Sequence, residues 1–186
     1  GVLTENDITG VAYTGEDWTA TGILLFESGD IVMNGDVVRS CQSGVNYSNW
    51  GGWGWQHPGT ASIALTGVET IECQWSISGY LGGADSNLDL TLTDCVVTDC
   101  TGDGVDVYGV EAFGAYHGDW ANGNVTVAID GLEISGADLD GLWLADLSPA
   151  GTNSFDSVIV RTSSFEGCVG NAINNQSNDP VDARLN

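Results

Sequence analysis

Two glycine-rich stretches, residues 46–62 and 108–124, concentrate the aromatic side chains of this sequence. Tryptophan and tyrosine rings bury a large area at a low cost in conformational entropy, so they suit a surface that binds sugars or a partner protein. The alternative is that these rings fold back onto the protein as a small satellite core. The residues expected in the binding surface are Tyr47, Trp50, Trp53, Trp55, His57, Tyr108, Phe113, Tyr116, His117 and Trp120.

The other chemistry-bearing residues do not form a complete catalytic set. The chain has no lysine, its three arginines are Arg39, Arg161 and Arg184, and its only histidines are His57 and His117. A Gly-x-Ser-x-Gly motif, a phosphate-binding loop and a zinc pattern are all missing from the sequence. We therefore predict a protein without catalytic residues.

The excess of acidic over basic residues limits the kinds of molecule that this chain can bind. The chain has 26 acidic and three basic residues, which gives a formal net charge of −23. Such a chain repels phosphate backbones and anionic membranes, so a nucleic-acid partner is excluded. No apolar run approaches the roughly 18 residues that a membrane-spanning helix needs, so we expect no membrane insertion. The composition is that of a secreted protein at the cell surface or outside the cell.

Six similar segments supply the elements that would position these residues. In each segment, short runs of alternating apolar and polar residues are separated by glycine, asparagine and aspartate, which is typical of strands and tight turns. Repeats of this length indicate a solenoid, in which every repeat stacks on the next. The six segments are residues 8–26, 31–47, 63–80, 90–108, 127–144 and 158–175.

These segments resemble the right-handed parallel β-helix repeats of the pectate-lyase-like and NosD-like families, over residues 8–175. The resemblance implies an all-β fold, a right-handed parallel β-helix of about six coils in one domain, residues 1–186. The two aromatic stretches are then loop insertions on one flank, and residues 145–156 are a third, weaker insertion. Proteins of this fold include lyases, hydrolases, epimerases, tailspikes and adhesins, so the resemblance does not determine the activity.

Three cysteines are expected to lie above one another in such a coil. Cys41, Cys73 and Cys100 recur at the same corner of successive repeats, where stacked residues lie about 4.8 Å apart. This spacing is within reach of a disulfide, so Cys73 is a candidate to bond with Cys41 or Cys100. A ladder of reduced thiols is the alternative.

A second column is expected directly before the third strand of each repeat: Thr21, Ser43, Ser76, Asp103, Asp140 and Asn171. Asp103 and Asp140 would then be neighbours, with Asp106 and Asp138 close by. Two adjacent carboxylates share a proton, move apart or bind a cation, and calcium prefers oxygen ligands. The sequence therefore raises a calcium site as one interpretation, a solvated acidic ladder as another, and an acid–base pair as a third.

Neither end of the chain shows a capping helix, so we expect open ends and, as one consequence, end-to-end self-association. The function predicted from the sequence is a non-catalytic extracellular module that binds a glycan or a protein through the aromatic flank, or that serves as a subunit of a surface structure or filament. The alternative is a polysaccharide lyase or glycoside hydrolase.

Overall fold

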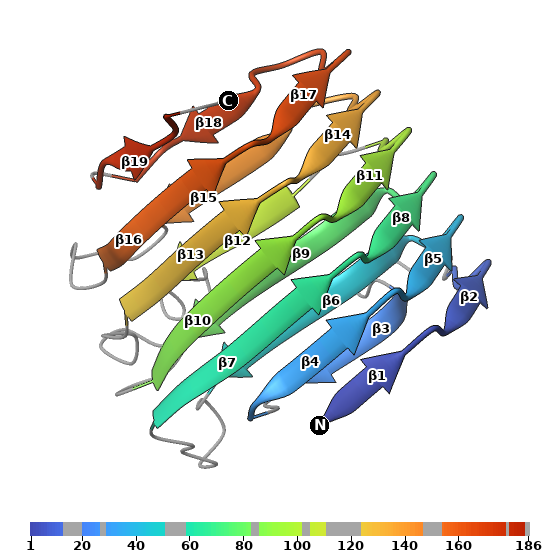
Figure 1. Ribbon diagram of the computed structural model, residues 1–186, viewed down its shortest axis with the longest axis horizontal. Coiled ribbons are helices and arrows are strands. Elements are labelled where there is room, and N and C mark those ends of the chain that lie inside the picture. Colours follow the sequence, from blue (N-terminus) through green and yellow to red (C-terminus); the bar gives the residue numbers. More distant parts are fainter. Residues whose placement is uncertain are drawn as a thin grey trace.

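The structure is a computed structural model of residues 1–186. It describes residues 1–12, 20–26, 29–50, 59–82, 86–101, 105–110, 124–146, 154–177 and 179–184. The regular elements in these ranges are all β-strands (Figure 1). No helix in the described part of the chain is long and apolar enough to cross a membrane.

The strands form three parallel sheets, which the chain visits repeatedly in the order A, B, C. Sheet A contains β1 (Val2–Thr4), β4 (Ile31–Asn34), β7 (Gly59–Thr66), β10 (Ser86–Thr93), β13 (Asn124–Asp130), β16 (Ser154–Arg161) and β19 (Val181–Asp182). Sheet B contains β2 (Asp7–Thr9), β5 (Val37–Arg39), β8 (Glu69–Ile71), β11 (Val96–Thr98), β14 (Glu133–Ser135) and β17 (Ser164–Glu166). Sheet C contains β3 (Thr21–Phe26), β6 (Ser43–Trp50), β9 (Trp75–Gly82), β12 (Val105–Val110), β15 (Leu142–Asp146) and β18 (Ile173–Asn175). This is the parallel β-solenoid that the repeats predict (Figure 1).

The core is built from identical register positions of successive coils. In sheet A, Met33, Leu65, Leu92, Ile129 and Val160 are paired in sequence along the stack. Each of these side chains is at most 1% exposed. Because the side chains of a strand alternate between its two faces, every second residue points inward and stacks on its equivalent. Full burial of one such side chain contributes roughly 1.5–3 kcal/mol, so a continuous column stabilises every coil it crosses.

The turn from sheet A to sheet B, the A–B corner, repeats the same conformation in every coil. The first residue of the turn has a positive φ, and from the second coil onward the second residue is buried. The positive-φ residues are Glu5, Gly35, Gly67, Asp94, Gly131 and Thr162. Backbone hydrogen bonds join them to the next coil, as from Gly67 N to Thr93 O at 2.9 Å and from Asp94 N to Asp130 O at 2.9 Å.

The turn from sheet B to sheet C, the B–C corner, begins in the same way. Its positive-φ residues are Gly10, Ser40, Glu72, Asp99, Gly136 and Gly167. The residues after them in the chain are Val11, Cys41, Cys73, Cys100, Ala137 and Cys168. At least one further residue lies between each of these residues and the next strand of sheet C, such as Gln42 between Cys41 and β6. The B–C corner therefore carries side chains that the A–B corner lacks.

Three of the long connections of the chain lie at the C–A corner, between sheets C and A, while residues 10–20 form another at the B–C corner between β2 and β3. Residues 51–58, 111–123 and 147–153 follow β6, β12 and β15, and they lead into β7, β13 and β16. The three predicted insertions therefore leave the solenoid from the same edge of sheet C, but they are shorter than predicted. Their outer residues belong to strands, namely residues 46–50, 59–62, 108–110, 124, 145–146 and 154–156. Residues 83–85, between β9 and β10, connect the same two sheets and form the shortest of these links.

The predicted polar column before sheet C is wrong at one position. Thr21 pairs with Ser43, but Ser43 pairs with Trp75 and not with Ser76. The reason is spacing along the chain. Ser43 is the second residue after Cys41, whereas Ser76 is the third after Cys73, so the two serines cannot share a level while the two cysteines do.

Candidate functional site

The structure corrects the prediction for Tyr47. This residue lies in β6 at an inward position, two residues after the buried Val45, and both are 0% exposed. Its backbone pairs with Leu25 and Gly79 of the neighbouring strands. Tyr47 is therefore a core residue and is not part of an exposed aromatic surface.

The backbone of two further predicted aromatic residues is placed by the register of sheet C. Trp50 is the last residue of β6 and pairs with Gly82, while Tyr108 of β12 pairs with Tyr80 and Ala145. Tyr80 was not among the predicted residues, although it ends the third repeat at the position that Tyr108 occupies in the fourth. The remaining predicted residues of this surface, Trp53, Trp55, His57, Phe113, Tyr116, His117 and Trp120, lie outside the described residues.

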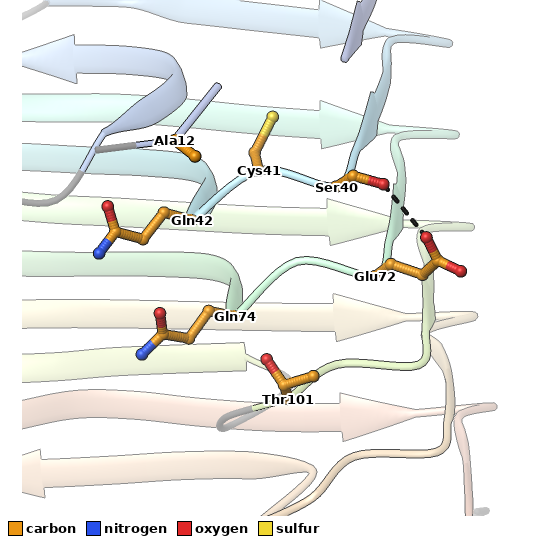
Figure 2. A pocket seen from close by; sticks show the side chains of 7 residues that line it. All are labelled: Ala12, Ser40, Cys41, Gln42, Glu72, Gln74 and Thr101. Atoms are coloured by element: carbon orange, nitrogen blue, oxygen red, sulfur yellow. Dashed lines mark hydrogen bonds between the residues drawn. The ribbon is translucent and has the colours of Figure 1, made fainter. Parts of the chain in front are cut away.

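An open groove of about 430 Å³ runs along the B–C corner (Figure 2). Sequence reasoning did not predict it. A signal was present, because three of the four cysteines at this corner are flanked by polar residues, in the triplets Ser-Cys-Gln, Glu-Cys-Gln and Asp-Cys-Thr. The groove is lined by Ala12, Ser40, Cys41, Gln42, Glu72, Gln74 and Thr101.

The stacking of the coils places Gln42, Gln74 and Thr101 above one another, and these residues form one side of the groove. Gln42 N donates a hydrogen bond to Val11 O at 2.9 Å, and Gln74 N donates to Cys41 O at 3.2 Å. In the next coil Thr101 N donates to the carbonyl of the corner cysteine below it, also at 3.2 Å. The side chains of Gln42 and Gln74 consequently extend in the same direction (Figure 2).

A hydroxyl and a carboxylate form the other side of the groove. Ser40 Oγ donates a hydrogen bond to Glu72 Oε2 at 3.1 Å (Figure 2). Both residues have a positive φ, of 48° and 52°, and this turn conformation directs the two side chains away from the core. None of the residues that line the groove is positively charged.

The predicted cysteine column is present beneath the groove. The backbone bonds that stack Gln74 on Cys41 and Thr101 on Cys73 make Cys41, Cys73 and Cys100 neighbours on successive coils. None of the five cysteines, all of them described, forms a disulfide, so the structure has the ladder of thiols.

The environment of Cys73 keeps its thiol protonated. Burial raises the pKa of Cys73, and the neighbouring thiols of Cys41 and Cys100 raise it further. Its Sγ lies 3.5 Å from Ile71 O and 3.7 Å from Val38 O, as expected for a protonated thiol that donates to carbonyl groups.

The predicted acidic cluster is described in part. Asp140 Oδ1 accepts hydrogen bonds from Asn171 N at 2.6 Å and from Asn171 Nδ2 at 3.0 Å, and its Oδ2 accepts from Asn174 Nδ2 at 2.6 Å. Partial burial alone would raise the pKa of Asp140, but these hydrogen bonds outweigh it and lower the pKa.

The other three aspartates do not complete a site in the described residues. Asp138 is exposed, and Asp106 lies in β12, where it pairs with Ser78 and Trp143. Asp103 lies outside the described residues, so the predicted calcium site and the acid–base pair stay predictions. Within the residues that the structure describes, no three His, Cys, Asp or Glu side chains are arranged to hold a metal ion.

All three arginines have carboxylate partners. Arg39 Nε lies 3.7 Å from Asp7 Oδ1, and Asp182 Oδ2 lies 2.6 Å from Arg161 Nη2 and 2.7 Å from Arg184 Nη2. The two arginines hold the pKa of Asp182 far below its usual range through hydrogen bonds and charge. Because the chain has no lysine, all of its Lys and Arg charge is paired with carboxylates.

Comparison with models of protein families, with curated proteins and with solved structures found no match to this chain. The likeness to β-helix repeats consequently rests on the repeat pattern and on the parallel solenoid itself.

Proposed function

We propose that this protein is a non-catalytic extracellular binding module that recognises a glycan or a protein partner through the loops at its C–A corner. The observation that carries the proposal is the shared exit of the aromatic connections. Residues 51–58 and 111–123 both follow strands of sheet C, and both return to sheet A. Loops that leave a rigid scaffold at one edge are a common way to build a binding surface.

The scaffold beneath these loops supports the proposal. In sheet C, β6 pairs with β9, β9 with β12 and β12 with β15, all in parallel register. Side chains on paired strands are held more precisely than side chains on isolated loops. The backbones of Trp50 and Val110, the last residues of β6 and β12, therefore give the two aromatic connections their starting points.

The state of Asp140 argues against one role in the enzyme alternative, that of the general acid. A general acid must be protonated at the working pH, and enzymes raise the pKa of such a carboxyl by burial or by a nearby negative charge. Three N–H donors stabilise the charged form of Asp140 instead. This environment does not suit the general acid of a glycoside hydrolase, which is the alternative function.

The test is a double substitution in the first aromatic stretch, Trp53→Ala with Trp55→Ala, with Leu24→Ala as the control. Leu24 is an apolar residue of β3, 58% exposed, and lies outside the long C–A connections. Affinity electrophoresis in gels that contain polysaccharides, and pull-down with surface proteins, measure binding, and the melting temperature measures folding. Loss of one aromatic anchor typically costs about 2 kcal/mol, or roughly 30-fold in affinity.

We expect the double variant to lose retardation while it keeps the melting temperature of the parent, and the control to retain both. Unchanged retardation with a lowered melting temperature would show that the rings are structural. Release of reducing or unsaturated sugar ends by the parent protein would instead establish the enzyme alternative.

A further inference from the structure

We propose that the groove along the B–C corner is a second binding site, and that it takes the neutral, polyhydroxylated chain of a glycan laid along the solenoid axis. The proposal deepens the binding role proposed above, on which it rests, but it concerns another surface. The groove lies on the opposite side of sheet C from the aromatic connections, because one corner precedes each strand of that sheet and the other follows it.

The polar side chains along the groove recur at a regular spacing, as binding of a polymer along the axis requires. Gln42, Gln74 and Thr101 directly follow the corner residue of three successive coils, so they recur at the inter-strand spacing of about 4.8 Å. Ser40 and Glu72 recur in the same way on the other side (Figure 2). A chain lying along the axis would therefore meet equivalent polar groups at regular intervals.

The chemistry of the groove suits sugar hydroxyl groups. A carboxamide offers both donors and an acceptor, and a hydroxyl group can donate or accept, so Gln74 and Thr101 can each pair with a sugar hydroxyl in either direction. Gln42 is already held in place, because its Oε1 accepts a hydrogen bond from Ala20 N at 3.0 Å. Gln74 and Thr101 are exposed. A side chain that is held before binding loses less entropy when the ligand arrives.

Charge selects a neutral glycan over an acidic one. The lining residues include the carboxylate of Glu72 and no cation, and the arginines elsewhere are engaged by carboxylates. A uronic acid or a sulfate group in the groove would meet the repulsion of a chain with a net charge of −23 and no compensating base. Neutral hydroxyl groups meet no such repulsion.

The test is calorimetric titration of the full chain with four neutral hexasaccharides (cellohexaose, chitohexaose, xylohexaose and mannohexaose) and with hexagalacturonate as the acidic probe. The groove variant combines Gln74→Ala with Thr101→Ala. The matched control is Val169→Ala, because Val169 holds the same column position two coils beyond Thr101 and is 77% exposed. Melting temperatures confirm that each variant folds.

We expect the parent to bind at least one neutral hexasaccharide, the groove variant to bind it at least tenfold more weakly, and the control to match the parent. Three outcomes would each overturn the proposal. The parent could bind hexagalacturonate more tightly than the neutral probes, it could bind none of the neutral probes, or the groove variant could bind as tightly as the parent. The Trp53→Ala, Trp55→Ala variant separates the two surfaces. If only this variant loses binding, the aromatic surface stands and the groove does not.

Discussion

The A–B and B–C corners start alike and end differently. Each begins with a residue of positive φ, such as Thr162 at 50° in the first and Asp99 at 52° in the second. In each, the next residue turns toward the core, where Leu132 of the A–B corner and Cys100 of the B–C corner are fully buried. The two corners therefore change the direction of the chain in the same way, with a positive-φ residue followed by a buried one.

The difference lies in the residues between the buried corner position and the next sheet. At the A–B corner the chain enters sheet B at once, as from Asp36 into β5. At the B–C corner three residues separate Cys41 from the buried Val45 of sheet C, whereas four separate Ala137 from the buried Leu142. The groove lies at this corner of variable length. Extra residues on a fixed turn thus give the B–C corner side chains that the A–B corner lacks.

The largest effect is expected from Gly44→Ala, which breaks the B–C corner. Gly44 packs so closely on the next coil that a β-carbon would collide with the carbonyl oxygen of Ser76 and press on Thr70. Because backbone atoms cannot move aside without shifting a coil, we expect a loss of about 3 kcal/mol in the free energy of unfolding, measured by urea denaturation. Gly29→Ala is the control, since a β-carbon there meets nothing within 4 Å. Equal stability of both variants would contradict the close approach.

A smaller effect concerns pH and Asp140, whose hydrogen bonds tie the B–C segments of two coils together. The pKa of this carboxyl is lowered by folding from its ordinary 3.8. Its contribution is therefore complete above pH 3.8 and is lost as the pH falls through the lower, folded value.

We expect the parent to be more stable than Asp140→Asn by about 1 kcal/mol near neutral pH, and this advantage to shrink as the pH falls below 3.8. Urea denaturation across these pH values gives the difference. Asp138→Asn, at an exposed carboxyl of the same segment, should show no comparable change. A constant gap between parent and Asp140→Asn at all pH values would rule out the assigned role.

The smallest effects are expected at the positive-φ residues with which both corners begin. Thr162→Gly and Asp99→Gly each replace an exposed residue of positive φ, one at each corner. A β-branched residue is strained in this conformation and aspartate is less so. We expect Thr162→Gly to raise the free energy of unfolding by about 1 kcal/mol and Asp99→Gly by about half as much. A loss of stability at either site would show that the side chain has a further role.

The sequence was sufficient for the architecture but not for the register at the B–C corner. Period-two alternation and the recurring cysteines predict the parallel coils and the column of Cys41, Cys73 and Cys100. Ser76 is chemically a better match for Ser43 than Trp75 is, yet the backbone pairing joins Ser43 to Trp75. Similarity of side chains is therefore a weaker guide to register than the count of residues from a fixed corner.

The burial of Tyr47 and the groove were missed for related reasons. A tyrosine next to an aromatic stretch resembles a surface residue until strand alternation is counted from the buried Val45. The groove depends on side chains from coils that are about 30 residues apart, as in the contact of Ser40 with Glu72, at a separation of 32 residues. Such neighbours appear in the sequence only after the length of every repeat is known.

Among the described residues, the backbone hydrogen bonds between coils join each coil only to the coils directly before and after it. Damage to one coil is therefore transmitted to its two neighbours and fades with distance, as in other one-dimensional arrays. Such a molecule unfolds progressively from a destabilised coil. A whole coil could be duplicated or deleted while the rest of the solenoid keeps its fold.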